Sequence, residues 1–229
     1  MIRSGSYKKL LRAYYSKLEK EEGLSTTDKP NKTDKTQQKV AETTTKLKAV
    51  SEDATALKDT AMKLAQKGEK SLFEKQTISE TDENGVTTTR KDYDYNAIVK
   101  TVKSFVENYN DTLDTVSKVD SPALQQKAGW LTANTKLYVD DLKEVGITVD
   151  ENNRLSVNEE TLRATDIDTL SELFEGANSF AGKAAVKANQ IGNYAQYQAT
   201  RTASAYNNNG GMYNSQVSLN SGALFDSLF

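Results

Sequence analysis

The clearest pattern of hydrophobic and polar positions in the chain is a heptad repeat between residues 40 and 68. Hydrophobic residues recur there at alternating steps of three and four, with Thr43 as the weak member: Val40, Leu47, Val50, Ala54, Leu57, Ala61 and Leu64. A repeat of about 3.5 residues keeps one seam of a helix facing a partner helix, as in a coiled coil. The pattern predicts a long helix that ends at Gly68, with Leu47, Val50, Leu57 and Leu64 in a packed seam.

A second apolar stripe with helical spacing lies between residues 94 and 119. Its members are Ile98, Val102, Phe105, Val106, Tyr109, Leu113 and Val116. A stripe of this width is typical of a helix with one face in a core. We expect the heptad seam to pack on the part of this stripe formed by Phe105, Val106, Tyr109 and Leu113.

Four further segments have helical patterns, namely residues 122–144, 159–163, 166–175 and 177–206. The first begins after Ser121 with Pro122, a residue that is favoured in the first turn of a helix. Its leucines are expected to face inward, with Trp130 near the middle of the helix: Leu124, Leu131, Leu137 and Leu142. Asn158 is placed to cap the second segment, and Gly176 to end the third.

Two short hairpins are expected between the helices. The first covers residues 73–93, where Asn84-Gly85 is flanked by β-branched residues. Both residues of this pair accept a positive φ, so Asn84-Gly85 predicts a two-residue type I′ turn. The second hairpin covers residues 146–157, with its turn at residues 150–153.

The two ends of the chain differ from this central domain, which we place at residues 40–206. Residues 1–22 predict an amphipathic helix, either a docking or membrane-surface helix or an ordinary helix packed on the body; its apolar members include Leu10, Leu11, Tyr14 and Tyr15. Residues 23–39 are polar, contain Pro30 and predict a linker. Residues 207–229 predict a flexible tail, whose last residues either fold back or form a docking motif: Leu224, Phe225, Leu228 and Phe229.

The composition favours extended helices over a compact enzyme. Only 36% of residues are hydrophobic, 27% are charged and the mean hydropathy is -0.69, while the two prolines leave long stretches without a helix breaker. We therefore predict a mainly α fold, a long antiparallel coiled coil or helical bundle with one or two short β-hairpins.

Few catalytic or ligand-binding chemistries are open to this chain. Without cysteine or histidine it lacks thiolate and imidazole groups, and a net charge of -2 gives no sign of nucleic-acid binding. No phosphate loop, nucleophile elbow, metal cluster, membrane-spanning run or Sec-type signal peptide is present in the sequence. The run from Asp150 begins like a calcium loop, but Leu155 and Thr161 occupy the positions where glycine and glutamate are needed. We expect no catalytic residues, metal, cofactor or small-molecule substrate.

Several collinear pieces between Asp94 and Phe174 resemble the C-terminal part of the flagellar filament-capping protein family, also called hook-associated protein 2. Residues 105–110 (FVENYN) are similar to a family signature FV–x–x–YN, and residues 150–157 (DENNRLSV) to its hairpin D–x–x–G–x–L, with Asn153 where glycine is usual. Residues 160–162 (ETL) and 170–176 (LSELFEG) resemble its following segment. The heptad helix stands where the family has a coiled coil, but the family's large variable domains are missing.

The resemblance implies a reduced relative that is structural and extracellular. Such a protein would be exported unfolded by a type III system, and its partners would be itself or other flagellar filament components. The alternative hypothesis is a cytoplasmic coiled-coil adaptor or secretion chaperone that binds one protein client, for which the Leu-Phe-rich C-terminus would be a natural docking element.

Overall fold

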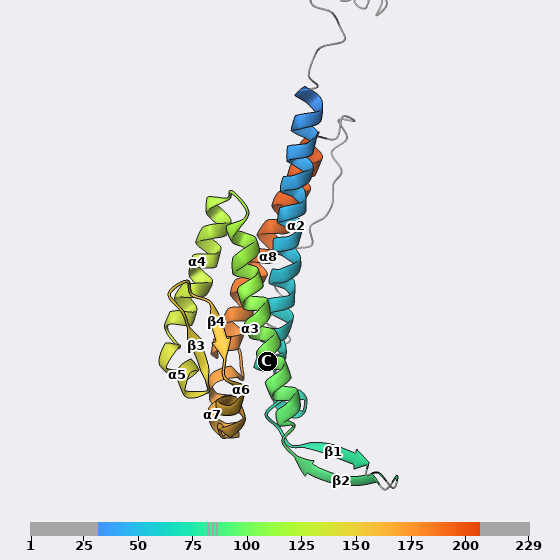
Figure 1. Cartoon of the computed structure of the whole chain (residues 1–229), viewed down its shortest axis with the longest axis vertical. Helices are drawn as coiled ribbons and strands as arrows, with labels where there is room; N and C mark the ends of the chain where they lie inside the picture. The colour runs from blue at the N-terminus through green and yellow to red at the C-terminus, as the bar shows by residue number, and fades with distance from the viewer. Residues whose placement is uncertain (1–31, 82, 84, 86, 207–229) are drawn as a thin grey trace, which may run out of the picture. The chain divides into compact units, whose positions relative to one another are not determined.

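The computed structural model of the chain describes residues 32–206 except residues 82, 84 and 86 (Figure 1). The chain divides into two compact units, residues 1–40 and 41–229. Of the first unit, the structure describes residues 32–40 as the beginning of a helix. The predicted N-terminal helix and C-terminal tail lie outside the described residues, and so do their candidate docking positions: Leu10, Leu11, Tyr14, Tyr15, Leu224, Phe225, Leu228 and Phe229.

The described part of the chain is mainly helical, with two small antiparallel hairpins, as predicted. Its helices are α2 (Lys32–Ala65), α3 (Tyr95–Ser117), α4 (Pro122–Lys136), α5 (Val139–Glu144), α6 (Glu159–Ala164), α7 (Ile167–Phe174) and α8 (Phe180–Tyr206), with a 3₁₀ turn η1 (Gly68–Lys70). Its strands are β1 (Gln76–Thr81), β2 (Thr87–Asp92), β3 (Ile147–Val149) and β4 (Leu155–Val157). Asn158 accepts the backbone N–H of Thr161 and so caps α6, as its position in the sequence predicts.

The heptad helix α2 is longer at its N-terminal end than predicted. It begins at Lys32, so residues 32–39 are helical and do not belong to a linker. Between Pro30 and Gly68 the sequence has neither proline nor glycine, so nothing in the chain interrupts the helix once it has started. Its last helical residue is Ala65, slightly before the predicted end, and Gly68 then takes a φ of 71°.

The predicted seam and the predicted stripe on α3 belong to one hydrophobic core. Leu47, Val50, Leu57 and Leu64 are buried, as are Phe105, Val106 and Tyr109, while Leu113 is half-buried against the same core. Asn108 joins the two helices directly, because its Nδ2 donates to the carbonyl of Ala56 at 3.2 Å and to Thr60 Oγ1 at 3.3 Å.

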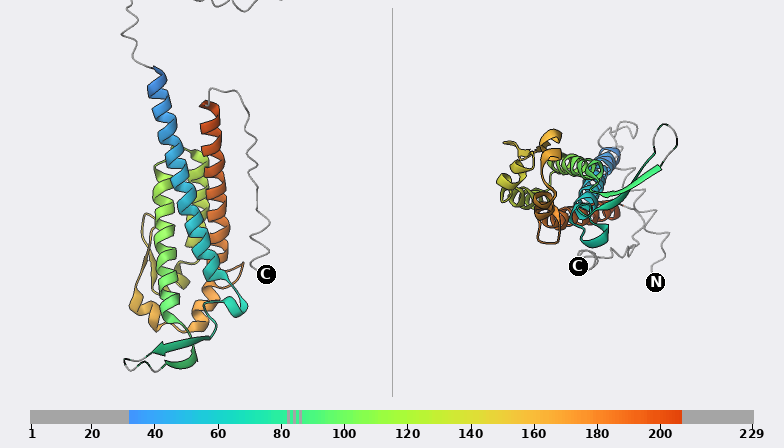
Figure 2. Two further views of the ribbon diagram at one scale, coloured as in Figure 1. Left: turned by 90° about the vertical axis from the view of Figure 1, so that its right-hand side faces the viewer. Right: turned by 90° about the horizontal axis from the view of Figure 1, so that it is seen from below.

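The long helix α8 packs on the same core, and Figure 2 shows it beside α2. A Cβ placed on Gly192 would lie 3.5 Å from the Cβ of Ala54, so the two helices pass close to each other at this point. The ring of Phe180 at the start of α8 meets Phe105 of α3 edge-on, with 5.6 Å between centroids. Aromatic contacts of this kind fix how the helices sit against each other.

Helix α4 is bound to α3 by a buried polar contact. The Tyr109 hydroxyl lies 3.0 Å from Thr135 Oγ1, and either atom can be the donor. Burial raises the pKa of Tyr109 to about 12, although the hydrogen bond with Thr135 acts in the opposite direction. The phenol therefore stays neutral across the physiological range, and no charge is buried there.

The predicted single helix over residues 122–144 is wrong. The helix stops at Lys136 and resumes at Val139, and Leu137 is 78% exposed. Leu137 follows Leu131 by six residues, which at about 100° per residue puts it about 120° away from the inward stripe. Because the helix is interrupted, the side chain of Tyr138 turns inward instead of that of Leu137. The ring of Tyr138 lies 5.5 Å from that of Phe180.

The first hairpin forms within the predicted residues, and its strands pair Gln76 with Asp92 and Thr81 with Thr87. In the loop, Gly85 takes a positive φ of 79°. Asn84, the other residue of the predicted type I′ turn, lies outside the described residues.

The second hairpin forms as predicted. Its strands pair Ile147 with Val157 and Val149 with Leu155. The Asp150 carboxylate accepts the backbone N–H groups of Asn152 and Arg154, each at 2.8 Å, so it is used as a turn acceptor in the segment that resembles a calcium loop.

Candidate interaction surface

The described part of the chain exposes large hydrophobic side chains on one group of helices. Four such residues are more than a third exposed: Trp130 at 44%, Leu137 at 78%, Val139 at 37% and Tyr197 at 46%. Three of them lie on α4, α5 and the link between them, and Tyr197 lies on α8, which packs against α4. Because grouped exposed hydrophobics of this size are uncommon on a monomer, this group marks a candidate interaction surface.

Two of these helices, α4 and α8, carry only basic charges. Helices α4 and α8 contain no aspartate or glutamate, and their charged residues are Lys127, Lys136, Lys183, Lys187 and Arg201. The whole chain has a net charge of -2, so the excess of acidic residues lies on other segments.

On α4 and α8, lysines approach the faces of aromatic rings. The Nζ of Lys127 lies 5.4 Å from the ring centroid of Trp130 and 5.3 Å from that of Tyr194. The Nζ of Lys187 lies 5.8 Å from the Trp130 ring. These cation–π contacts bring two ammonium groups close to one exposed indole. We refer to Lys127, Trp130, Lys187 and Tyr194 as the Trp130 patch.

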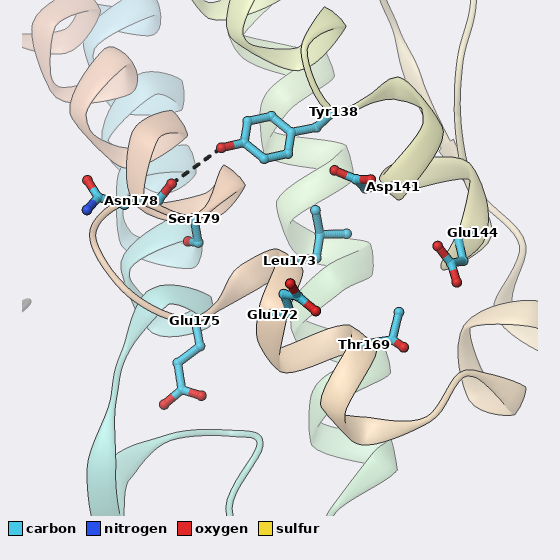
Figure 3. A pocket seen from close by; sticks show the side chains of 9 residues that line it. All are labelled: Tyr138, Asp141, Glu144, Thr169, Glu172, Leu173, Glu175, Asn178 and Ser179. Carbon is cyan, nitrogen blue, oxygen red and sulfur yellow. Dashed lines mark hydrogen bonds between the residues drawn. The ribbon is translucent and has the colours of Figure 1, made fainter.

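A cleft of about 480 Å³ lies between α5, α7 and the beginning of α8 (Figure 3). Its lining, which we call the acidic cleft, consists of Tyr138, Asp141, Glu144, Thr169, Glu172, Leu173, Glu175, Asn178 and Ser179. Figure 3 shows the carboxylates of Asp141, Glu144 and Glu172 around the side chain of Leu173.

Hydrogen bonds fix the walls of the acidic cleft. The Tyr138 hydroxyl donates to the carbonyl of Asn178 at 3.3 Å and accepts from Lys183 Nζ at 2.7 Å. Ser179 Oγ donates to the carbonyl of Phe174 at 2.6 Å and accepts the backbone N–H of Gly182 at 3.0 Å. The cleft is therefore preformed in the folded chain.

The helix that supplies Thr169 and Glu172 has its own cap. The Asp166 carboxylate accepts the backbone N–H of Thr169 at 2.9 Å and its hydroxyl at 2.7 Å. The bond from the Thr169 backbone is the main reason why the pKa of Asp166 lies below its ordinary value. The cap therefore keeps its charge, and its hold on the first turn of α7, at neutral pH.

The carboxylates of the cleft differ in their hydrogen-bond and ion-pair partners. Glu175 accepts a hydrogen bond from Ser171 Oγ at 2.6 Å. Asp141, Glu144 and Glu172 form no ion pair with any described residue. Together with the apolar floor of Leu173 and the ring of Tyr138, they offer a site for a group that is both cationic and apolar.

Nothing in the described residues assembles a metal site. No group of three or more acidic side chains there has the spacing to hold a metal ion. None of the helices described is both long and apolar enough to cross a bilayer.

The residues singled out from the sequence are not those of this surface. The eight predicted packing positions on α2 and α3 lie in the core, and the predicted docking positions lie outside the described residues. The exposure of Trp130 and Leu137 was not predicted from the sequence. Each follows an inward leucine by six residues, Leu124 and Leu131 respectively, so helical phase could have identified both.

No family model matches the chain, and no curated protein or solved structure shows significant similarity to it. Its function is therefore inferred from its own residues and their geometry.

Proposed function

We propose that the protein is a non-catalytic structural or assembly protein, flagellar filament cap-like or filament-associated, that acts by helix-mediated self-association and docking. The observation that carries this proposal is the exposed face of α4, α5 and α8, with Trp130, Leu137, Val139 and Tyr197 at its surface. Exposed tryptophan and tyrosine side chains are typical of surfaces that bind other proteins.

The contacts between the segments that resemble the capping family support this proposal. Asn110, at the end of the FV–x–x–YN segment, bonds both backbone groups of Leu155, which belongs to the hairpin segment. At the position where the family has glycine, Asn153 takes a φ of 61°, a conformation that asparagine tolerates better than most residues. This departure from the family pattern is therefore compatible with the same turn.

The location of the protein tests this proposal most directly. We propose that it is exported by a type III system and acts outside the cell, at the bacterial flagellum. Immunoblots of cells, sheared filaments and culture medium should detect it outside the wild-type host and only inside a strain that lacks flagellar export. Retention in the cytoplasm of both strains would contradict the flagellar proposal.

We also propose that α2 packs antiparallel to a neighbouring helix along its heptad seam, as in a coiled coil. Leu57 in this seam is fully buried, so Leu57→Asp would bury an unpaired charge, and we expect the variant to lose cooperative folding. Circular dichroism melting and light scattering after gel filtration would measure folding and mass. Lys48→Asp, at an exposed position of the same helix, is the control. Unchanged melting and mass in Leu57→Asp would rule out the seam.

A cytoplasmic coiled-coil adaptor or secretion chaperone is the second candidate. It is favoured by the preformed acidic cleft beside exposed Leu137 and Val139, an arrangement that suits a client segment with cationic and apolar residues. Under this hypothesis the protein stays inside both strains and co-purifies with one client.

A further inference from the structure

We infer that the Trp130 patch of one copy docks in the acidic cleft of a second copy, which makes these two surfaces the joint of the self-association proposed above. The inference rests on that proposed function and names the surfaces that carry it.

The two surfaces are complementary in chemistry. The patch presents an exposed indole flanked by the ammonium groups of Lys127 and Lys187. The cleft presents an apolar floor and the carboxylates of Asp141, Glu144 and Glu172, which have no ion-pair partner among the described residues. An indole seated on Leu173 would bring two lysines to this acidic rim, so that apolar burial and charge pairing occur in one contact.

The size of the cleft suits such an insertion. Its volume of about 480 Å³ lies within the roughly 300–1,000 Å³ that is usual for pockets that accept small molecules, and it is open to solvent. Because hydrogen bonds of Tyr138 and Ser179 hold its walls, little conformational entropy is lost when it is filled.

The order of the surfaces along α4 and α5 favours a two-fold pair of copies. The exposed Leu137 and Val139 lie in sequence between Trp130 of the patch and Asp141 of the cleft. If two copies pack in opposite directions about these residues, each patch meets the cleft of the other copy, and Leu137 and Val139 are covered at the centre. Such an isologous contact uses both surfaces twice and leaves neither unpaired.

Trp130 is the only tryptophan in the chain, so its fluorescence reports on the patch alone. As the concentration of the wild-type chain rises through the range in which its mass increases, we expect Trp130 emission to shift to shorter wavelength. An increase in mass with no shift in emission would overturn the docking inference and leave self-association intact. A chain that stays monomeric at all concentrations would overturn both.

Paired charge reversals test the same contact. Two double variants reverse the charges: Lys127→Glu/Lys187→Glu changes the patch, and Asp141→Lys/Glu172→Lys changes the cleft. Each should weaken its own homodimer about 100-fold, because like charges then face each other at both joints. Mixing the two variants should restore the dimer, since both joints of the mixed pair again join opposite charges. Lys91→Glu/Lys100→Glu changes two exposed lysines outside α4 and α8 and should leave the mass unchanged. Melting curves would show that each variant is folded. Two charge-reversal variants that both dimerise as the wild type does would overturn the inference.

Discussion

The two hairpins share an antiparallel topology but have opposite surroundings. β1 and β2 have six residues each, and every residue from Thr87 to Lys91 is exposed. β3 and β4 have three residues each, yet Ile147 and Leu155 are buried in the core. The longer ladder therefore belongs to the hairpin with the weaker attachment to the body.

Side chains of neighbouring helices complete the backbone hydrogen bonds of the shorter hairpin. Asn110 of α3 donates to the carbonyl of Leu155 at 2.8 Å and accepts its N–H at 2.9 Å. The Asn158 N–H donates to the carbonyl of Gly146 at 2.8 Å, and a Cβ on Gly146 would lie only 2.8 Å from that of Thr161. An amide side chain thus takes the place of a third strand, and close packing leaves no room for a side chain at residue 146.

The longer hairpin is stabilised chiefly by its own sequence. Its strands are rich in threonine, a residue that fits a pleated, exposed surface, and Gly85 supplies a positive φ in the loop. A two-stranded hairpin alone is marginally stable in water. The comparison teaches that a hairpin with a strong local sequence signal can form without a buried core, whereas a hairpin with a weak signal depends on tertiary contacts.

The largest expected difference comes from the same substitution in each hairpin. Ile147→Ala removes a fully buried side chain and should lower the free energy of unfolding by about 2–4 kcal/mol. Ile78→Ala, at a half-buried position of β1, should lower it by less than about 1 kcal/mol. Urea unfolding followed by circular dichroism measures both values. Equal losses would show that the two hairpins are equally well anchored.

Removal of the amide bridge should have the next largest effect. Asn110→Ala leaves both backbone groups of buried Leu155 without a partner and should lower stability by about 2–3 kcal/mol. Asn110→Asp keeps the acceptor for the Leu155 N–H but sets a carboxylate oxygen against the Leu155 carbonyl, so it should lose stability as well. Thr88→Ala in the exposed strand β2 is the control and should change stability by less than about 0.5 kcal/mol. If the control lost as much as Asn110→Ala, the role given to the bridge would be wrong.

A smaller effect is expected at the turn of the second hairpin. Asn153 has a φ of 61°, so Asn153→Ala should lower stability by about 1 kcal/mol, while Asn153→Gly should be close to neutral. Thermal melting of the two variants separates backbone conformation from side-chain contacts. A glycine variant as unstable as the alanine variant would show that the asparagine side chain itself is needed.

The smallest effect is expected from shortening the first hairpin. Gln76 and Asp92 are register partners, so residues 77–91 can be replaced by Asn-Gly without separating the strand ends. We expect the melting temperature of the body to change by about 2 °C or less, because the removed side chains whose burial the structure describes are exposed or half-buried. A large loss would reveal contacts of this hairpin that stabilise the helices.

The elements that the sequence determined by itself are those set by residues within one or two helical turns. The seam of α2, the stripe of α3 and the Asn158 cap depend on spacing and on local backbone preferences, so they could be predicted. Turn residues and the β-branched or apolar residues beside them likewise predicted both hairpins close to the residues where they form.

Tertiary structure decided the features that depend on residues far apart in the chain. The bond between Asn110 and Leu155 spans 45 residues, and the Trp130 patch joins α4 to α8. Helical phase could have shown that Trp130 and Leu137 lie off the inward face, but it could not show that no neighbouring element covers them. Spacing along the chain determines which residues share a face, but only the folded arrangement decides which faces find a neighbour and which stay open to a partner.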